Sequence, residues 1–189
     1  MNYSQVIFGL GPSGVGKSHI LELLAPQIGF FLLDLDTKRP FSRNALREEW
    51  HVFGTELNPG PLLNALHNRI FAEKTAGIIL SFPSTRILTP EHVAAARAVG
   101  IRTILLWGPA DLCREAALGR EDGRVNTEAQ YDKSNQSVFA TYGRAEYDSI
   151  RVETFFNGSR LPPAAILDHI RLLIAAEQVV GRERRERVS

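Results

Sequence analysis

The residues with the clearest chemical meaning in this sequence are eight near its start, GPSGVGKS, which run from Gly11 to Ser18. They satisfy the pattern G-x-x-x-x-G-K-[ST], in which closely spaced glycines let backbone N–H groups converge on one phosphate. A helix that begins near Gly16 points its unbonded N–H groups at the same anion. Lys17 adds charge for the β- and γ-phosphates, and Ser18 offers a hydroxyl to Mg²⁺. The sequence therefore predicts binding of ATP together with magnesium.

The candidate nucleotide ligands are the whole loop and the residue after it, which we expect to pack beside it: Gly11, Pro12, Ser13, Gly14, Val15, Gly16, Lys17, Ser18 and His19. The loop alone does not identify the reaction, because ATPases, GTPases and small kinases share it. No N-K-x-D stretch occurs, so guanine-specific recognition has no support. The apolar run at residues 77–82 also lacks the aspartate that often holds magnesium in such proteins.

A pair of carboxylates follows the second apolar run, FFLLDLD, which ends in Asp34 and Asp36. Side chains two residues apart on a strand point to the same face. The carboxyl edge of a parallel sheet is also where ligands bind in α/β proteins. One of these carboxylates could hold the water shell of a metal ion, and the other could orient or deprotonate an acceptor hydroxyl.

The elements that must position these residues alternate along the chain, as in an α/β fold with a parallel sheet. Apolar runs predict strands at residues 6–10, 30–35, 77–82, 101–107 and 150–156. Amphipathic stretches predict helices at residues 16–27, 59–74, 90–99, 111–118 and 163–179. The runs are continuously apolar, which indicates that helices cover both faces of the sheet. Residues 37–56 and 119–133 fit neither pattern and are expected to carry binding loops or a lid.

Composition places limits on the function. The chain has 189 residues, 44% of them apolar, and a formal charge of +1. This predicts one globular domain and gives no support for a nucleic-acid partner. A single cysteine, Cys113, cannot form an internal disulfide, and no apolar run is long enough to span a bilayer. We expect a cytoplasmic protein, a monomer or homodimer, with a charged tail at residues 181–189.

The loop together with a strand that ends in D-x-D resembles the shikimate kinase group of small P-loop metabolite kinases, to which gluconate kinases and other nucleoside-monophosphate-kinase-like proteins are related. The resemblance implies a P-loop NTPase fold in three α/β/α layers. Its parallel sheet has five strands in the order 2-3-1-4-5. It also implies an acceptor-binding segment, here residues 37–76, and an arginine-bearing lid, here residues 114–134. The sequence departs from shikimate kinase after the third strand, where Ser81, Phe82, Pro83 and Ser84 replace a run of glycines. We therefore expect a different acceptor.

The resemblance also implies roles for individual residues. Asp34 would serve the magnesium ion together with Ser18, and Asp36 would hold and activate the acceptor hydroxyl. The remaining roles fall to arginines: Arg120 and Arg124 on the phosphates during transfer, Arg114 on the nucleotide, and Arg43, Arg47 and Arg144 on the acceptor.

These residues predict a Mg·ATP-dependent phosphotransferase that acts on a hydroxyl of a small, anionic or neutral metabolite. Two alternatives stay open at this point. The first is a kinase for nucleoside monophosphates or nucleic-acid ends, because the sequence GPSGVGKS also resembles the phosphate loops of guanylate kinases. The second is a nucleotide-binding sensor or accessory protein with little turnover, which the missing glycines after the third strand would suit.

Overall fold

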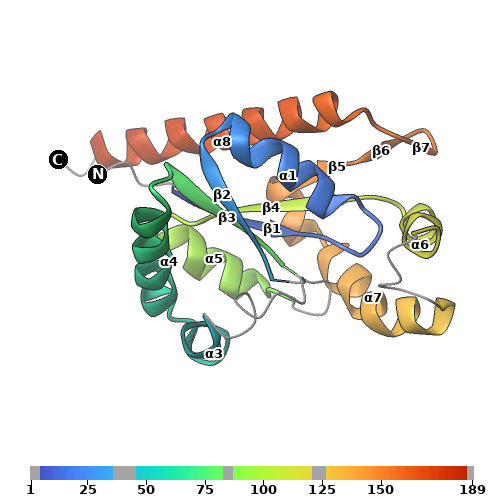
Figure 1. The fold of residues 1–189 in the computed structure, drawn as a ribbon, viewed down its shortest axis with the longest axis horizontal. Coiled ribbons are helices and arrows are strands. Elements are labelled where there is room, and N and C mark those ends of the chain that lie inside the picture. The colour runs from blue at the N-terminus through green and yellow to red at the C-terminus, as the bar shows by residue number, and fades with distance from the viewer. Residues whose placement is uncertain (1–4, 36–45, 83–86, 121–126, 187–189) are drawn as a thin grey trace.

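The protein is described by a computed structural model that covers residues 5–35, 46–82, 87–120 and 127–186 (Figure 1). Its centre is a parallel sheet in the order β2-β3-β1-β4-β5. The strands are β1 (Val6–Leu10), β2 (Phe30–Asp34), β3 (Gly77–Ser81), β4 (Arg102–Trp107) and β5 (Arg151–Glu153). The predicted strand order 2-3-1-4-5 is therefore confirmed.

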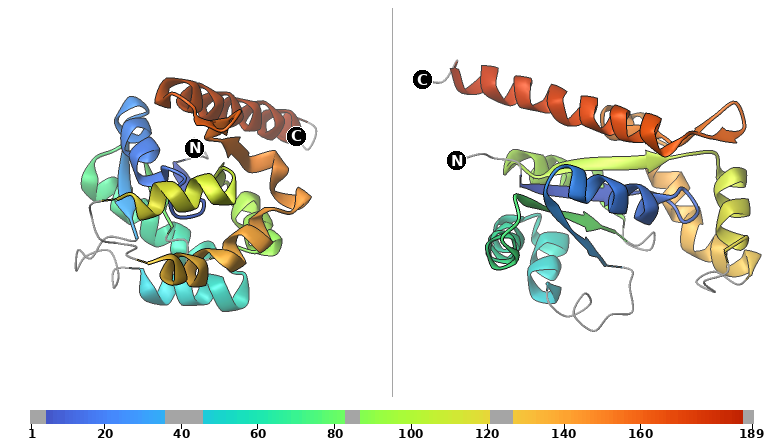
Figure 2. Two further views of the ribbon diagram at one scale, coloured as in Figure 1. Left: turned by 90° about the vertical axis from the view of Figure 1, so that its right-hand side faces the viewer. Right: turned by 45° about the horizontal axis from the view of Figure 1, so that its top comes forward.

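Helices cover both faces of this sheet, as Figures 1 and 2 show. One face carries α1 (Lys17–Gln27) and the long α8 (Pro163–Glu186). The other carries α4 (Gly60–Glu73), α5 (Pro90–Ala98) and α7 (Glu128–Tyr142), with α3 (Arg47–Glu56) beside α4. The remaining helix, α6 (Ala110–Leu118), lies beyond the end of β4.

Two cores follow from the alternation of side chains along buried strands. On the α4–α5–α7 face, Phe8 of β1 and Leu80 of β3 pack with Leu66 of α4. On the α1–α8 face, Ile7 and Ile79 pack with helical leucines and isoleucines. All five residues of β1 and of β3 are buried. The three-layer prediction thus agrees with the structure.

The fifth strand is shorter than residues 150–156. It ends at Glu153, and Phe155–Phe156 (β6) turns back to pair antiparallel with Ser159–Arg160 (β7). The turn residues Asn157 and Gly158 have φ values of +48° and +77°. Asn-Gly is the preferred dipeptide of such tight hairpins, because both central residues need positive φ. The prediction of a single strand over residues 150–156 is therefore wrong for its last part, where Asn-Gly marks a hairpin.

Two helices lie in the stretches that fitted no pattern. The prediction of an irregular segment through residue 133 is wrong for its last part, because α7 begins at Glu128. Its cap is Thr127, whose hydroxyl accepts a hydrogen bond from the Gln130 N–H at 3.2 Å. A threonine followed three residues later by glutamine is a helix-start signal. The other helix is α3, within residues 37–56.

The remaining helices follow the predicted ranges closely, except that α8 continues to Glu186, into the expected charged tail. A short 3₁₀ helix, η1 (Ala145–Ile150), leads into β5. Among the described residues, no helix is both long enough and apolar enough to cross a membrane.

Candidate active site

The phosphate loop (residues 11–18) connects the end of β1 to the start of α1, as its motif requires. Gly14 has a φ of +83°, a conformation that side chains disfavour. A Cβ at Gly14 would also lie only 1.8 Å from the backbone oxygen of Cys113 on α6. The glycine therefore lets α6 pack directly against the loop, in addition to supplying the turn.

The first turn of α1 presents the loop's two chemical side chains. Lys17 is 8% exposed, and its Nζ lies 3.5 Å from the Gly11 carbonyl oxygen. The N-cap of α1 is Gly16, which makes no side-chain capping bond. The N–H groups of this turn thus face the loop without a capping side chain, which suits an anion at the helix N-terminus.

Ser18 and Asp34 meet beside the loop. The Ser18 hydroxyl donates a hydrogen bond to Asp34 Oδ2 at 3.3 Å. Asp34 ends β2 and stands opposite Ser81 of β3, which in turn stands opposite Gly9 of β1. The carboxyl end of β2 therefore lies beside the phosphate loop, with β3 between β2 and β1.

These oxygens fit a magnesium ion. Mg²⁺ is commonly bound by one or two protein oxygens together with substrate phosphates, not by a cage made only of protein. Ser81 Oγ is buried and has no hydrogen-bond partner among the described residues, so a polar atom is left beside Asp34. No group of three or more His, Cys, Asp or Glu side chains in the described ranges could bind a metal alone. Ser18 and Asp34 are thus the residues that would hold the ion.

Several predicted site residues cannot be placed. Asp36, Arg43 and Arg124 lie outside the described residues, and Arg47 is described only as the first residue of α3. Their proposed roles stay predictions.

The other three predicted arginines have definite surroundings. Arg114 of α6 contacts Glu128 and Asp132 of α7, at 2.8 and 3.4 Å, and so ties the two helices together. Arg120 follows α6 and is partly exposed. Arg144 is exposed at the start of η1. Their contacts with nucleotide or acceptor stay predictions.

Three residues that the sequence reasoning missed touch the phosphate loop. Asn135 Oδ1 accepts a hydrogen bond from the Ser13 N–H at 2.8 Å, and the Tyr131 hydroxyl donates to the Ser13 carbonyl oxygen at 3.5 Å. Arg160 donates to the oxygens of Gly14 and Val15, at 2.7 and 3.0 Å. No motif marks these residues, because they come from α7 and β7, far from the loop in sequence.

A cluster of aromatic side chains packs in the core on the α4–α5–α7 face of the sheet. Phe82 follows β3, and its ring centroid lies 5.0 Å from that of Phe8 and 4.7 Å from that of Trp50. Phe53 of α3 is fully buried in the same cluster. Phe53 is thus a core residue, while Trp50 is only partly buried and joins α3 to the sheet.

Cys113 of α6 packs against the loop at Gly14, but its thiol is a poor nucleophile. Burial raises the pKa of its thiol to about 12. A cysteine reacts as the thiolate, which is scarce at neutral pH with such a pKa. Cys113 is therefore not a candidate nucleophile.

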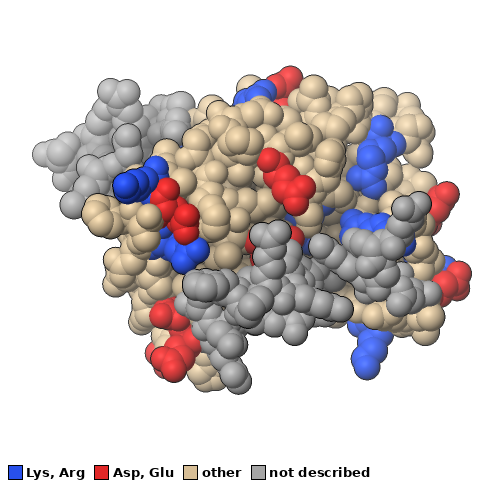
Figure 3. Space-filling model, in the orientation of Figure 1, with Lys and Arg blue, Asp and Glu red and all other residues tan. Residues whose placement is uncertain are grey.

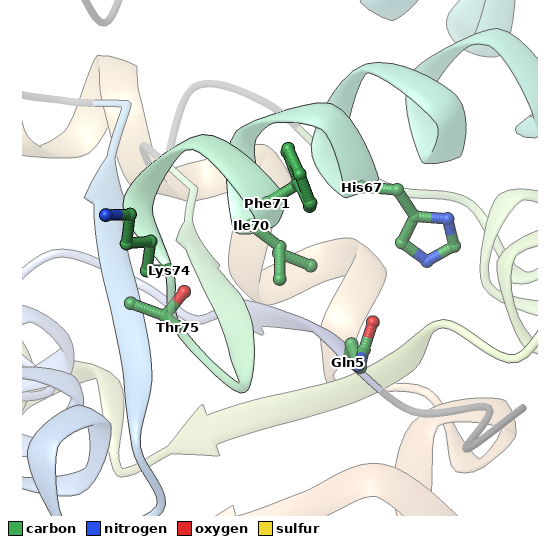
Figure 4. Close-up of a pocket in the computed structure, with 6 residues that line it drawn as sticks. All are labelled: Gln5, His67, Ile70, Phe71, Lys74 and Thr75. Atoms are coloured by element: carbon green, nitrogen blue, oxygen red, sulfur yellow. The ribbon is translucent and has the colours of Figure 1, made fainter.

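The phosphate loop lies apart from an open hollow elsewhere on the molecule. On the right of Figure 3, the side where the connection between β1 and α1 lies in Figure 1, both basic and acidic side chains reach the surface. An open hollow of about 470 Å³ lies instead beside Gln5, ahead of β1, and so at the opposite end of that strand (Figure 4). The residues around it are Gln5, His67, Ile70, Phe71, Lys74 and Thr75.

Comparisons with known proteins agree with this geometry at the level of the fold. A sugar kinase from Janibacter sp. HTCC2649 has a TM-score of 0.54 at 19% identity, over 91% of this chain and 95% of that one. A gluconokinase from Sinorhizobium meliloti has 0.53 at 17%, over 100% of both. A shikimate kinase from Acinetobacter baumannii, solved with shikimate, has 0.50 at 17%, over 91% and 93%. No protein-family model and no curated protein sequence matches the chain.

The fold is therefore that of small P-loop kinases, as the resemblance implied. At these identities the likeness concerns the fold alone, so activity and acceptor must be argued from this chain's own residues.

Proposed function

We propose that this protein transfers the γ-phosphoryl group of ATP to a hydroxyl of a small metabolite. The observation that carries the proposal is the hydrogen bond between Ser18 and Asp34, because it joins the phosphate loop to a carboxylate at the carboxyl edge of the sheet. A fold shared with sugar, gluconate and shikimate kinases supports the same reading.

The phosphate loop would bind the nucleotide through its backbone N–H groups. Lys17 would reach from the Gly11 carbonyl to the β- and γ-phosphates. Ser18 and Asp34 would hold a magnesium ion, which when bound neutralises charge on those phosphates. Catalysis in this class is mostly positioning and electrostatic stabilisation, which a loop fixed on a rigid sheet can supply.

Asp36 would act on the acceptor. It lies two residues beyond Asp34 in the sequence, after the end of β2. The acceptor oxygen would attack the γ-phosphorus, the bond to the ADP oxygen would break, and Asp36 would take the hydroxyl proton. Arg120 and Arg124 would stabilise the moving phosphoryl group, and Arg114 would contact the nucleotide. We assign Arg43, Arg47 and Arg144 to the acceptor.

The test is acceptor-stimulated ADP release, measured in a coupled assay with Mg·ATP and a panel of hydroxylated metabolites. We expect turnover with at least one member of the panel and none in Lys17→Ala. Arg171→Ala is the control, because Arg171 lies on α8 and pairs with Asp168, away from the loop. Full activity of Lys17→Ala would contradict the proposal.

The same assay separates the alternatives. Stimulation by nucleoside monophosphates alone would indicate a nucleotide kinase. ATP binding without stimulation by any acceptor would indicate a sensor or accessory protein.

A further inference from the structure

We propose that Arg160, Tyr131 and Asn135 are positioning residues that hold the phosphate loop in its anion-binding shape. Together they form a clamp on the loop from two elements, the β6–β7 hairpin and α7. The inference rests on the proposed function, because it concerns how the same loop binds the phosphates of ATP.

Three successive carbonyl groups of the loop are bound by the clamp. The Tyr131 hydroxyl donates to the oxygen of Ser13. The two terminal nitrogens of Arg160 donate to the oxygens of Gly14 and Val15. The clamp therefore fixes the direction of three consecutive peptide planes.

Fixing these carbonyls also fixes the N–H groups that a phosphate needs. In a planar trans peptide the N–H points opposite to the C=O of the preceding residue. With the carbonyls of Ser13, Gly14 and Val15 turned to the clamp, the N–H groups of Gly14, Val15 and Gly16 point away from it. Among the described residues, none accepts a hydrogen bond from these three N–H groups. They are thus left oriented for a bound anion.

Asn135 sets where this row of donors begins. Its Oδ1 accepts the Ser13 N–H at 2.8 Å, and its Nδ2 donates to the Tyr131 carbonyl at 2.9 Å. Asn135 is 1% exposed, and both the oxygen and the nitrogen of its amide are hydrogen-bonded. The Ser13 N–H is therefore used by α7, and the anion-binding donors start at Gly14.

Arg160 is itself held in place. Its guanidinium lies over the Phe155 ring, 4.6 Å from the centroid, within the β6–β7 hairpin. A Cβ on Gly16 would lie 2.5 Å from Arg160 Nη1, so this glycine is what permits the close approach. The planar guanidinium serves two carbonyls at once, which an ammonium group on one flexible stem does poorly.

The clamp should act on phosphate binding, not on recognition of the nucleoside. A loop that is already ordered loses less entropy when the anion binds, so removing the clamp should weaken the affinity for phosphates. Adenosine carries no phosphate, so its affinity should not change. This contrast separates a positioning role from general damage to the fold.

The experiment uses the full chain and isothermal titration with ATP, inorganic tripolyphosphate and adenosine. For Arg160→Ala we expect affinity for ATP and tripolyphosphate to fall together, by about 10- to 100-fold, with adenosine unchanged. Added guanidinium ion should restore part of the loss. Tyr131→Phe should show a smaller loss of the same kind. Arg171→Ala and Gln136→Ala, on the exposed side of α7, are the matched controls.

If Arg160→Ala unfolds, Arg160→Lys and Tyr131→Phe carry the test, since both keep most of the packing. Unchanged tripolyphosphate affinity in the folded variants would overturn the clamp, and so would an equal loss for adenosine. Wild-type protein that binds ATP and tripolyphosphate but releases no ADP with any acceptor would contradict the proposed function and leave the clamp standing.

Discussion

Gly14 occupies a position that combines two separate demands. Its φ of +83° is costly for other residues, and the backbone of α6 leaves no room for a Cβ. Gly29, at the turn between α1 and β2, has a φ of +70° but only an ordinary contact, 3.6 Å from Ala76 Cβ. A substitution at Gly29 therefore tests the cost of backbone strain alone, whereas one at Gly14 adds a steric clash with α6.

We expect Gly29→Ala to lower the free energy of unfolding by about 1–2 kcal/mol, the usual cost of a left-handed residue with a side chain. Gly14→Ala should cost more, because Cys113 or the loop must move, and it should also weaken ATP binding. Urea denaturation and ATP titration measure the two effects. Equal stability losses with unchanged ATP affinity would show that the contact with α6 is unimportant.

At the level of single residues, the phosphate loop and Asp34 could be predicted because their chemistry lies in local spacing. The clamp could not, since Arg160 bonds to a loop residue 146 positions earlier and Asn135 to one 122 positions earlier. An arginine two residues after Asn-Gly has no local property that indicates which carbonyls it will meet.

Among the elements, the segment before α5 is held by two buried tyrosines. The Leu88 N–H donates to the Tyr142 hydroxyl at 2.9 Å, and the Tyr147 hydroxyl donates to the Leu88 oxygen at 2.8 Å. The two rings pack edge to face, with centroids 5.0 Å apart. The backbone N–H and the carbonyl of Leu88 are thus both hydrogen-bonded to side chains, one from α7 and one from η1.

Removing one hydroxyl should leave a buried backbone group without a partner. We expect Tyr147→Phe to lower the free energy of unfolding by about 1–3 kcal/mol, because the Leu88 carbonyl loses its donor while the packing is kept. Tyr142→Phe should act similarly through the Leu88 N–H. Chemical denaturation checks both, and a stability within error of wild type would mean that water replaces the lost bond.

Element existence was easier to predict than element ends. The strands of the sheet could be predicted because each lies within an apolar run of five to seven residues, and β1 and β3 are buried along their whole length. The start of α7 and the β6–β7 hairpin were missed although Thr127–Gln130 and Asn157–Gly158 carry recognised signals. Polar surroundings hid the start of α7, whereas the apolar Phe155–Phe156 of the hairpin continue the run that was predicted as a single fifth strand.

Taken as a whole, the molecule keeps several weak acids away from water. Burial raises the pKa of Cys113 and of Tyr147 to about 12 each, and it also raises the pKa of Tyr131 and Tyr142. In the unfolded chain these groups have ordinary values, so they release protons at lower pH there than in the folded protein. The folded state then binds more protons, and stability must fall as pH rises.

We therefore expect the free energy of unfolding to be unaffected by these groups at neutral pH and to decline from about pH 9 towards about pH 12. Urea denaturation across this range measures the decline. Cys113→Ala removes the group whose ordinary pKa is lowest, so its curve should be flatter at the start of the window. A wild-type stability that is constant or rises there would contradict the assignment.

The clamp also bears on the order in which the molecule is made. The phosphate loop leaves the ribosome early, but its partners on α7 and β7 emerge only after most of the sheet has been synthesised. Contacts so distant in sequence form late, because the intervening chain must be ordered first. A nascent chain that ends before Arg160 would contain the whole nucleotide motif, and at most Tyr131 and Asn135 of the clamp, without the guanidinium that binds the Gly14 and Val15 carbonyls. Competence to bind ATP would then arise near the end of synthesis, and bound nucleotide would report that folding had reached the final hairpin.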